Sequence, residues 1–417
     1  MTKFTKVLKN RNFFLLWVGQ IISQVGDRLD QMALIAFISS REGTSTLDIA
    51  KILSFTIIPV FIIGPLAGAY VDRWDRRRTM FISDLLRAAL VFTIPFFFLN
   101  RQNLIPVYLI VFIIFSIGRF FVPAKMSIIP DLVDKKDILI ANSLVNTTGM
   151  IAAILGFGVS GIIVEWLKAR GGFYLDAFSF LASGTCIYFI SRRSSIHLGF
   201  KEVGKEIVEV IRKSVLAEMK DGILYFMRKK DIRFTAAITF VLFSALGSVY
   251  VVVIVFVQQT LNSITKDLGL LVMFLGIGLF VGSLLYGRFG QRVSHYKSIF
   301  TSLILSGVML IAFAAMLERY PSFQLAALLA FWLGLSIAPI MIASNTIIHN
   351  ASESEMRGKI FSSLEIVMHL GFLLFMLLSS YLAERVAPVL ILVTVGGIIG
   401  IVGIISLIYH RRIPWLE

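Results

Sequence analysis

Long apolar stretches recur along the chain at intervals of about 35 residues, separated by polar segments. Each stretch has about 20 residues or more, the length that an α-helix needs to cross the hydrocarbon core of a bilayer. The predicted stretches are 13–38, 49–71, 79–99, 104–124, 142–167, 173–191, 233–258, 267–287, 298–317, 322–348, 358–383 and 387–410. The pattern therefore predicts an all-α integral membrane protein with twelve transmembrane helices.

One joining segment is much longer than the others and divides the predicted helices into two sets of six. We expect an N-terminal six-helix half at 1–191, a cytoplasmic linker at 192–232 and a C-terminal six-helix half at 233–417. Within the linker, apolar residues recur at spacings of three and four: Ile207, Ile211, Val215, Met219, Ile223 and Phe226. This spacing predicts an amphipathic helix against the inner leaflet or the cytoplasmic helix ends, either as a tether between the halves or as a regulatory element.

Lys and Arg are unevenly distributed among the joining segments. If the N terminus is inside the cell, the inner segments carry 28 of the 40 basic residues. Basic loop residues resist translocation and so mark the cytoplasmic side. We therefore expect both termini in the cytoplasm, in a multi-pass protein of a bacterial inner membrane. The net charge of +15 follows from the same rule, so it does not indicate a nucleic-acid partner.

Neither the composition nor the motifs favour an enzyme. Only 16% of the residues are charged, whereas about a quarter are charged in soluble domains. The one cysteine, Cys186, lies in an apolar stretch and forms no disulfide, metal or redox motif. The chain lacks the Gly-x-Ser-x-Gly and Gly-x-x-x-x-Gly-Lys-Ser/Thr motifs, which argues against an acyltransferase and a built-in ATPase. We expect no catalytic residue, no metal and no cofactor.

Two segments about half a chain apart are similar. The sequence after the second predicted helix is GAYVDRWDRRR (68–78), and the sequence after the eighth is SLLYGRFGQR (283–292), with Arg73 and Arg288 separated by an offset of 215. An offset of 216 aligns Pro123 with Pro339. The two landmarks predict related halves, an arrangement common in transporters, whose solute site lies between the repeats.

The first of these segments resembles the signature loop of the major facilitator superfamily, G-x-x-x-D-R/K-x-G-R/K-R/K. The resemblance implies a gating motif of Gly68, Asp72, Arg73, Arg76 and Arg77, and Asp75 stands where the family has its second glycine. FFLLWVGQIISQVGDRLDQMAL, VPAKMSIIPDLV, FYLDAFSFLASG and EMRGKIFSSLE are similar to the branch with macrolide-efflux proteins, the enterobactin exporter and the lysophospholipid transporter. Membership implies a secondary transporter that works by alternating access.

Two segments leave the substrate open. Residues 156–161, GFGVSG, replace the proline and one glycine of the G-P-x-x-G-G pattern of proton antiporters, which weakens the inference of proton antiport. Pro123-Ala124-Lys125 is instead similar to lysophospholipid transporters. We expect export of an amphipathic or hydrophobic small molecule, with proton antiport as one possibility, and a lysophospholipid flippase of the same fold as the alternative.

The first predicted helix carries a polar stripe. At 100° per residue, Gln20, Gln24, Asp27 and Gln31 fall within 60° of one another, and Arg28 and Asp30 flank them. Because the first helix lines the central cavity in the resembling family, we interpret the stripe as part of the solute or proton path. The alternative is a structural ion pair of Asp27 or Asp30 with Arg28 or with a neighbouring helix.

Other charged residues inside predicted helices are also candidates. Glu365 and His369 are one turn apart and could pass a proton, although Glu365 could instead pair with Arg119 or Arg87. Asp84 and Arg87 are spaced to pair beside the signature loop, as part of the gating motif.

Lys125 is expected to end the fourth helix at the cytoplasmic side. There it could, with Arg119, guide a phosphate head group, or it could extend to the membrane surface. The expected partners are membrane lipid, the solute and, in the antiport version, protons, and we expect a monomer.

Overall fold

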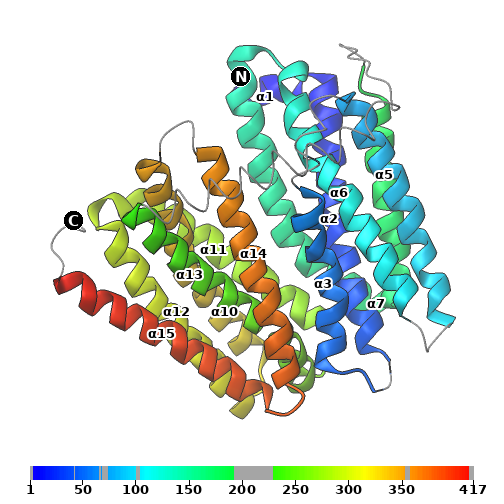
Figure 1. The fold of residues 1–417 in the computed structure, drawn as a ribbon. Helices are drawn as coiled ribbons and strands as arrows, with labels where there is room; N and C mark the ends of the chain where they lie inside the picture. Colours follow the sequence, from blue (N-terminus) through cyan, green and yellow to red (C-terminus); the bar gives the residue numbers. More distant parts are fainter. Residues whose placement is uncertain are drawn as a thin grey trace. The chain divides into compact units, whose positions relative to one another are not determined.

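The computed structural model describes residues 3–41, 43–64, 67, 74–99, 104–191, 229–352 and 357–412. Within these ranges the regular structure is helical (Figure 1). The predicted linker helix lies outside the described residues, and so do Gly68, Asp72 and Arg73 of the predicted gating motif.

The chain forms two compact units. Unit 1 consists of Met1–Thr44 and Ile52–Ile211, and unit 2 of Ser45–Lys51 and Arg212–Glu417. The elements up to residue 191 are α1 (Lys3–Leu8), α2 (Arg11–Ser39), α3 (Thr46–Ile62), α5 (Arg76–Thr93), η1 (Ile94–Leu99), α6 (Ile105–Leu132), η2 (Lys135–Asp137) and α7 (Ile138–Tyr188). Those of the later part are α10 (Lys230–Leu261), α11 (Lys266–Phe289), η4 (Gly290–Arg292), α12 (His295–Arg319), α13 (Phe323–Ala351), α14 (Arg357–Leu382) and α15 (Pro388–Arg412). The predicted domain boundaries stay a prediction.

Nine helices among the described residues are long and apolar enough to cross a membrane. The helix α2 is not among them, and its polar residues include Asp27, Arg28 and Asp30 within four positions. Another, α3, has only 17 residues in its described helix. The chain is therefore a multi-pass membrane protein, and the number of twelve spans and the position of the termini stay predictions.

The predicted fifth and sixth helices are both part of α7, and α7 breaks at Lys168, whose backbone has φ 60° and ψ 176°. Before the break, Gly149 lies beside Gln20 and Gln24, and Gly156 beside Arg28, so this part runs parallel to α2. After the break, Gly172 lies beside Ala33 and Ser183 beside Gly19, so this part runs antiparallel to α2. The two parts of α7 therefore run antiparallel to each other, and α2 packs against both. They correspond to the separate fifth and sixth helices that the sequence predicts.

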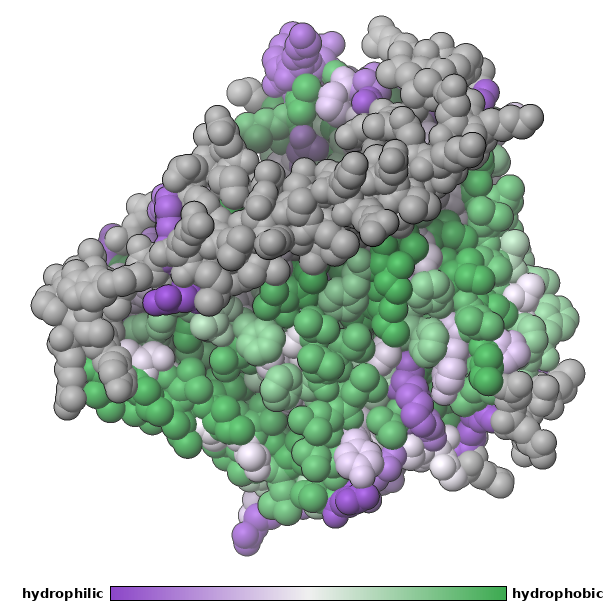
Figure 2. Space-filling view, in the orientation of Figure 1, coloured by the Kyte–Doolittle hydropathy of each residue, from purple (hydrophilic) through white to green (hydrophobic). Residues whose placement is uncertain are grey.

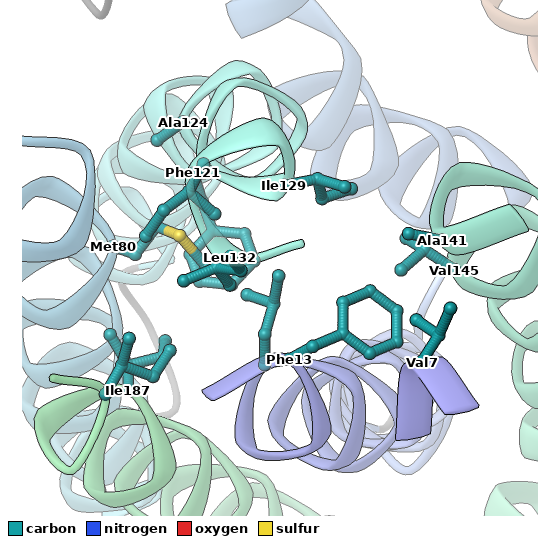
Figure 3. Close-up of a cluster of buried hydrophobic side chains, with 13 residues drawn as sticks. Val7, Phe13, Met80, Phe121, Ala124, Ile129, Leu132, Ala141, Val145 and Ile187 are labelled. Atoms are coloured by element: carbon teal, nitrogen blue, oxygen red, sulfur yellow. The ribbon is translucent and has the colours of Figure 1, made fainter. Parts of the chain in front are cut away.

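One end of unit 1 is closed by a cluster of buried apolar side chains (Figure 3). Phe13 of α2 and Ile129 of α6 are fully buried there, together with Met80 of α5 and Val145 and Ile187 of α7. The short helix α1 is fixed at the same end, where Lys6 pairs with Asp137 at 2.8 Å. The start of α2 therefore packs tightly against α5, α6 and α7. This packing fixes the position of the polar stripe further along α2.

In unit 2, glycines let helix backbones approach closely. A methyl group added at Gly278 or Gly334 would overlap the facing backbone between α11 and α13, and one added at Gly307 would overlap α15.

In the view of Figure 2, the described surface between the two polar ends consists mainly of hydrophobic residues. Large apolar side chains such as Phe178, Leu109 and Ile401 are more than half exposed. Apolar surfaces of this kind are expected to contact the lipid chains of a membrane rather than water.

Candidate functional site

The polar stripe of α2 faces a cavity inside unit 1. The helix begins after Asn10, whose side chain accepts hydrogen bonds from the backbone of Asn12 and Phe13, so its register is fixed at the closed end. The cavity has a volume of about 300 Å³. Its lining comes from α2, α5, α6 and α7: Gln20, Ser23, Gln24, Asp27, Arg28, Asp30, Gln31, Arg87, Ile114, Phe115, Gly118, Arg119, Phe121, Val122, Lys125 and Phe180.

All the path residues that were predicted in the N-terminal half line this one cavity. Six of them come from α2 and two, Arg119 and Lys125, from α6. Three phenylalanines and two aliphatic side chains share the wall with these polar groups. The site therefore offers charge and apolar surface together, which suits a solute with both a polar and an apolar part.

Arg87 connects the cavity with the buried side of α5. Its guanidinium bonds the carboxylate of Asp84, as predicted from their spacing, and lies 3.6 Å from Oδ1 of Asp27. The rings of Phe121 and Phe180 lie 4.9 and 4.1 Å from the guanidinium carbon. The neighbouring-helix pair considered for Asp27 is thus present, since α5 provides its partner, and Arg87 lines the cavity.

Asp84 itself is fully buried behind the cavity wall. Its second oxygen accepts a hydrogen bond of 2.6 Å from the Ser183 hydroxyl of α7. With Arg87 on one oxygen and Ser183 on the other, this carboxylate is satisfied, and α5 is tied to α7 through a polar contact in an apolar surrounding.

Arg28 is held in the cavity by α2 and α7. Its Nη1 donates to Oε1 of Gln31 at 2.9 Å, and its guanidinium lies 4.7 Å from the ring centroid of Phe157. Gly156 leaves room for the Arg28 stem, because an added Cβ would lie 3.2 Å from its Cγ. Phe157, which replaces the proline of the antiporter pattern, therefore has a definite contact in this chain.

The expectation that Lys125 ends its helix is wrong. The helix α6 continues through Pro130 to Leu132, and Lys125 is only 9% exposed and lines the cavity. Prolines inside membrane helices are tolerated because neighbouring groups satisfy the freed backbone, so the Pro-Ala-Lys sequence does not stop α6.

Sequence reasoning missed Asp176 of α7. Its side chain is fully buried, one oxygen accepts a 3.1 Å hydrogen bond from Ser179, and the other has no partner among the described residues. Gly26 of α2 packs directly on this pair, since an added Cβ would overlap the Ser179 hydroxyl. A search for acidic residues within apolar stretches would have found Asp176, which lies in the FYLDAFSF segment.

Asp30 lies between the cavity and the core of unit 1. It is 3% exposed and lines the cavity, and its Oδ1 has no hydrogen-bond partner among the described residues. Asp30 and Asp27 give the lining two acidic side chains against four basic ones.

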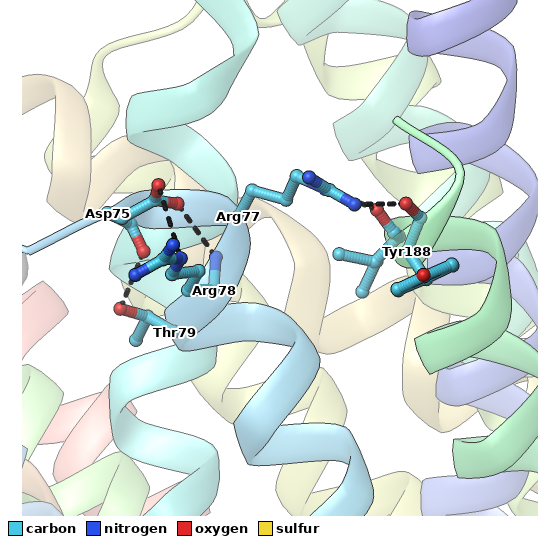
Figure 4. A network of polar contacts seen from close by, with 6 residues as sticks. Asp75, Arg77, Arg78, Thr79 and Tyr188 are labelled. Atoms are coloured by element: carbon cyan, nitrogen blue, oxygen red, sulfur yellow. Dashed lines mark hydrogen bonds and ion pairs between the residues drawn. The ribbon is translucent and has the colours of Figure 1, made fainter. Parts of the chain in front are cut away.

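The described part of the gating motif ties three helices together at the closed end of unit 1. Arg76 pairs with Asp131 of α6 at 2.7 Å, and Arg77 donates to the backbone carbonyls of Ile187 and Tyr188 at the end of α7. Figure 4 shows Arg77 reaching toward Tyr188, while Asp75 and Arg78 form a separate group. These contacts support a structural role for the basic run at this end.

Asp75 explains why this chain needs no second glycine in the motif. Its φ is −64°, a conformation open to any residue, and its side chain accepts a 2.9 Å hydrogen bond from the backbone N–H of Arg78. Asp75 is therefore the N-cap of α5 (Figure 4).

Glu365 and His369 lie in unit 2 on one face of α14, as their spacing predicts. Nδ1 of His369 is 2.8 Å from the backbone oxygen of Glu365, and its ring lies 6.2 Å from that of Phe243. The contact is to the Glu365 backbone rather than its carboxylate. Within the described residues, no group of three or more His, Cys, Asp or Glu side chains is arranged to hold a metal ion.

Comparison with known proteins gives several matches. A family model described as "transmembrane secretion effector" matches residues 3–350. Macrolide efflux protein A of Streptococcus pyogenes is 24% identical over 392 residues, which cover 90% of each chain. The multidrug efflux pump Tap of Mycolicibacterium fortuitum is 24% identical over 362 residues, which cover 84% of each chain.

The fold also matches solved structures. A crystal structure of a mutant of the nucleoside transporter NupG superposes with a TM-score of 0.76 at 12% identity, covering 96% of this chain and 99% of the other. At this identity the match concerns the fold alone.

Proposed function

This chain belongs to the transmembrane secretion effector family of the major facilitator superfamily, and from that premise we propose that it exports an amphipathic or hydrophobic small molecule by alternating access. The membership makes it a multi-pass membrane transporter, and its relatives include efflux proteins. The finer proposal is a secondary transporter of a bacterial inner membrane, with both termini in the cytoplasm.

One observation carries this proposal: the polar stripe of α2 opens into a cavity that has an aromatic wall as well as charges. Phe115, Phe121 and Phe180 offer apolar contact to a solute, and Gln24 offers hydrogen bonds. Two members of the stripe have partners on neighbouring helices, Asp27 with Arg87 of α5 and Gln20 with the backbone oxygen of Val145 in α7. The stripe nevertheless borders open volume, which is the arrangement expected of a solute path.

Proton exchange would involve Asp27 in this proposal. Its side chain is 40% exposed to the cavity and is paired with Arg87, so a proton or a solute that reaches Asp27 changes the charge balance around Arg87. A carboxylate in such a position can alternate between a proton and an ion pair during the cycle. Glu365 and His369 are proposed as a second proton-accessible pair in the C-terminal half.

Flux through proteoliposomes tests the proposal. We expect the purified chain to transport a hydrophobic dye, faster when a pH gradient drives protons in the opposite direction, and the Asp27→Asn variant to lose the stimulation by the gradient. Asp134→Asn, an exposed aspartate outside the cavity, is the matched control and should keep it. Dye transport that is indifferent to both the gradient and Asp27→Asn would refute proton antiport, and absence of any flux would refute the exporter.

A lysophospholipid flippase of the same fold is the second candidate. The observation that favours it is the burial of Lys125 in the cavity, where Arg119 also lies, instead of at the membrane surface. In this version the two basic residues guide the head group while the acyl chain follows the apolar wall. Lysophospholipid flux in the same vesicles, with no dye flux, would select the flippase over the drug exporter.

A further inference from the structure

Lys125 is a buried cation without a direct anionic contact among the described residues. It is 9% exposed, and it makes no hydrogen bond or ion pair with any residue that the structure describes. An ammonium group removed from water without a partner costs several kcal/mol. Its side chain borders the cavity, so a group that enters the cavity can provide the missing partner.

The acidic residues of the cavity make no direct contact with Lys125, and Asp27 acts on it only through longer-range Coulomb attraction. Asp27 is paired with Arg87, which also bonds Asp84. Asp30 is only 3% exposed, so it presents little of its carboxylate to the cavity. The lining has four basic side chains and two acidic ones, and with Asp84 behind Arg87 counted as a third carboxylate the basic side chains still outnumber the acidic ones.

Arg28 provides a second donor group in the same cavity. Its Nη1 is bonded to the neutral amide of Gln31, and its buried Nε has no partner among the described residues. The ring of Phe157 contacts the guanidinium at 4.7 Å from behind the cavity wall, and Phe157 is not itself a lining residue. This contact holds Arg28 in place without neutralising it, because an aromatic ring carries no net charge.

We infer that the cavity of unit 1 binds the anionic group of the transported solute, a phosphate or a carboxylate, through Lys125 and Arg28, with Phe157 as the residue that positions Arg28. The inference rests on the proposed transport function and adds the chemical class of its substrate. The apolar part of the solute packs on Phe115, Phe121 and Val122 of α6. Charge-assisted hydrogen bonds to an oxyanion satisfy both cations at once.

Equilibrium binding to the purified full chain in a neutral detergent tests this inference. The probes are octyl phosphate, octanoate and octylammonium, which share a chain length and differ in charge. We expect both anions to bind at least about tenfold more tightly than octylammonium, and Lys125→Met to weaken anion binding by about tenfold or more. Lys125→Arg should retain it, and Lys136→Met, an exposed lysine eleven residues further along, is the matched control.

Two further readouts separate binding from a structural role. Because Lys125 lacks a direct partner, Lys125→Met should leave the thermal midpoint of the unliganded protein unchanged or raise it, whereas loss of a structural contact would lower it. Phe157→Leu should weaken anion binding several-fold, and Phe157→Tyr should restore it. Octylammonium bound as tightly as the anions, or anion binding unchanged in Lys125→Met, would overturn the inference.

A competition experiment identifies the source of the anion. Displacement of octyl phosphate by lysophosphatidylcholine supports a lipid head group, and its absence supports a free amphiphilic anion; both agree with an anion site. Binding needs no vesicle and no gradient, so the two proposals can fail separately. Anion binding without any flux would refute only the transport proposal, and flux without charge preference would refute only the anion site.

Discussion

Arg87 is the residue on which most contacts of the cavity converge. It touches two carboxylates and two aromatic rings that come from α2, α5, α6 and α7. Its side chain is 6% exposed. A buried cation is tolerated only when anionic partners balance its charge, and a buried carboxylate such as Asp84 likewise needs the cation.

The Arg87→Met variant should therefore be strongly destabilised. Removal of the guanidinium leaves the fully buried Asp84 without its cation, for an expected loss of about 3–5 kcal/mol in unfolding free energy. Thermal or denaturant unfolding in detergent measures this loss. Arg78→Met, the same change at an exposed position of the same helix, should stay within about 0.5 kcal/mol. A loss below about 1 kcal/mol in Arg87→Met would show that Asp84 does not depend on it.

Gly26 should also be sensitive to substitution, for a steric reason. An added methyl group overlaps the Ser179 hydroxyl and must displace the pair formed with Asp176. We expect Gly26→Ala to lower the unfolding free energy by about 1–3 kcal/mol. Gly397→Ala, in α15, meets nothing within 4 Å and should leave stability unchanged or raise it by up to about 1 kcal/mol. Equal stability of the two variants would contradict this packing.

The residues of the cavity could be predicted from sequence to different degrees. The stripe of Gln20, Gln24 and Asp27 follows from helical spacing alone, because residues on one helix face must share an environment. The pairing of Asp27 with Arg87 depends on which helix packs beside α2, and the spacing of residues within one helix does not predict its neighbours. Lys125 was placed at a helix end because the predicted apolar stretch stops at residue 124, whereas its burial follows from packing across helices.

At the scale of elements, helix positions were predicted well and their ends less well. Apolar length locates a helix, whereas its ends depend on caps and local hydrogen bonds. The helix α6 extends eight residues beyond its predicted end, to Leu132, where Asn10 donates to the Leu132 carbonyl at 2.5 Å. The break in α7 at Lys168 is a backbone feature of one residue, and the predicted boundary between the two helices falls beside it.

The N-cap of α5 gives a prediction at this scale. Asp75→Ala removes the acceptor of the Arg78 backbone N–H and should cost about 1 kcal/mol, whereas Asp75→Asn should keep the cap. Asp75→Gly, which restores the family's glycine, should cost only a few tenths. Unfolding of the three variants side by side measures the difference. If Asp75→Ala were as stable as the wild type, the side chain would not act as a cap.

For the whole molecule, the internal repeat and the family membership favour two units that act together. Pro123 and Pro339, aligned by an offset of 216, lie inside α6 and α13, one in each unit. The cavity of unit 1 lies within a single half, and transport requires that its polar stripe become accessible from each side of the membrane in turn.

Accessibility of Gln24 tests this requirement. Cys186 is the single cysteine of the chain, so a Cys186→Ser background allows a new cysteine to be labelled alone. Ser160→Cys, at a fully buried position of α7, is the control and should react from neither side.

With a membrane-impermeant maleimide applied to vesicles of either orientation, Gln24→Cys is predicted to react from both sides, with both rates lowered by bound solute. Reaction from one side only, under every condition of solute and pH, would contradict alternating access through this cavity.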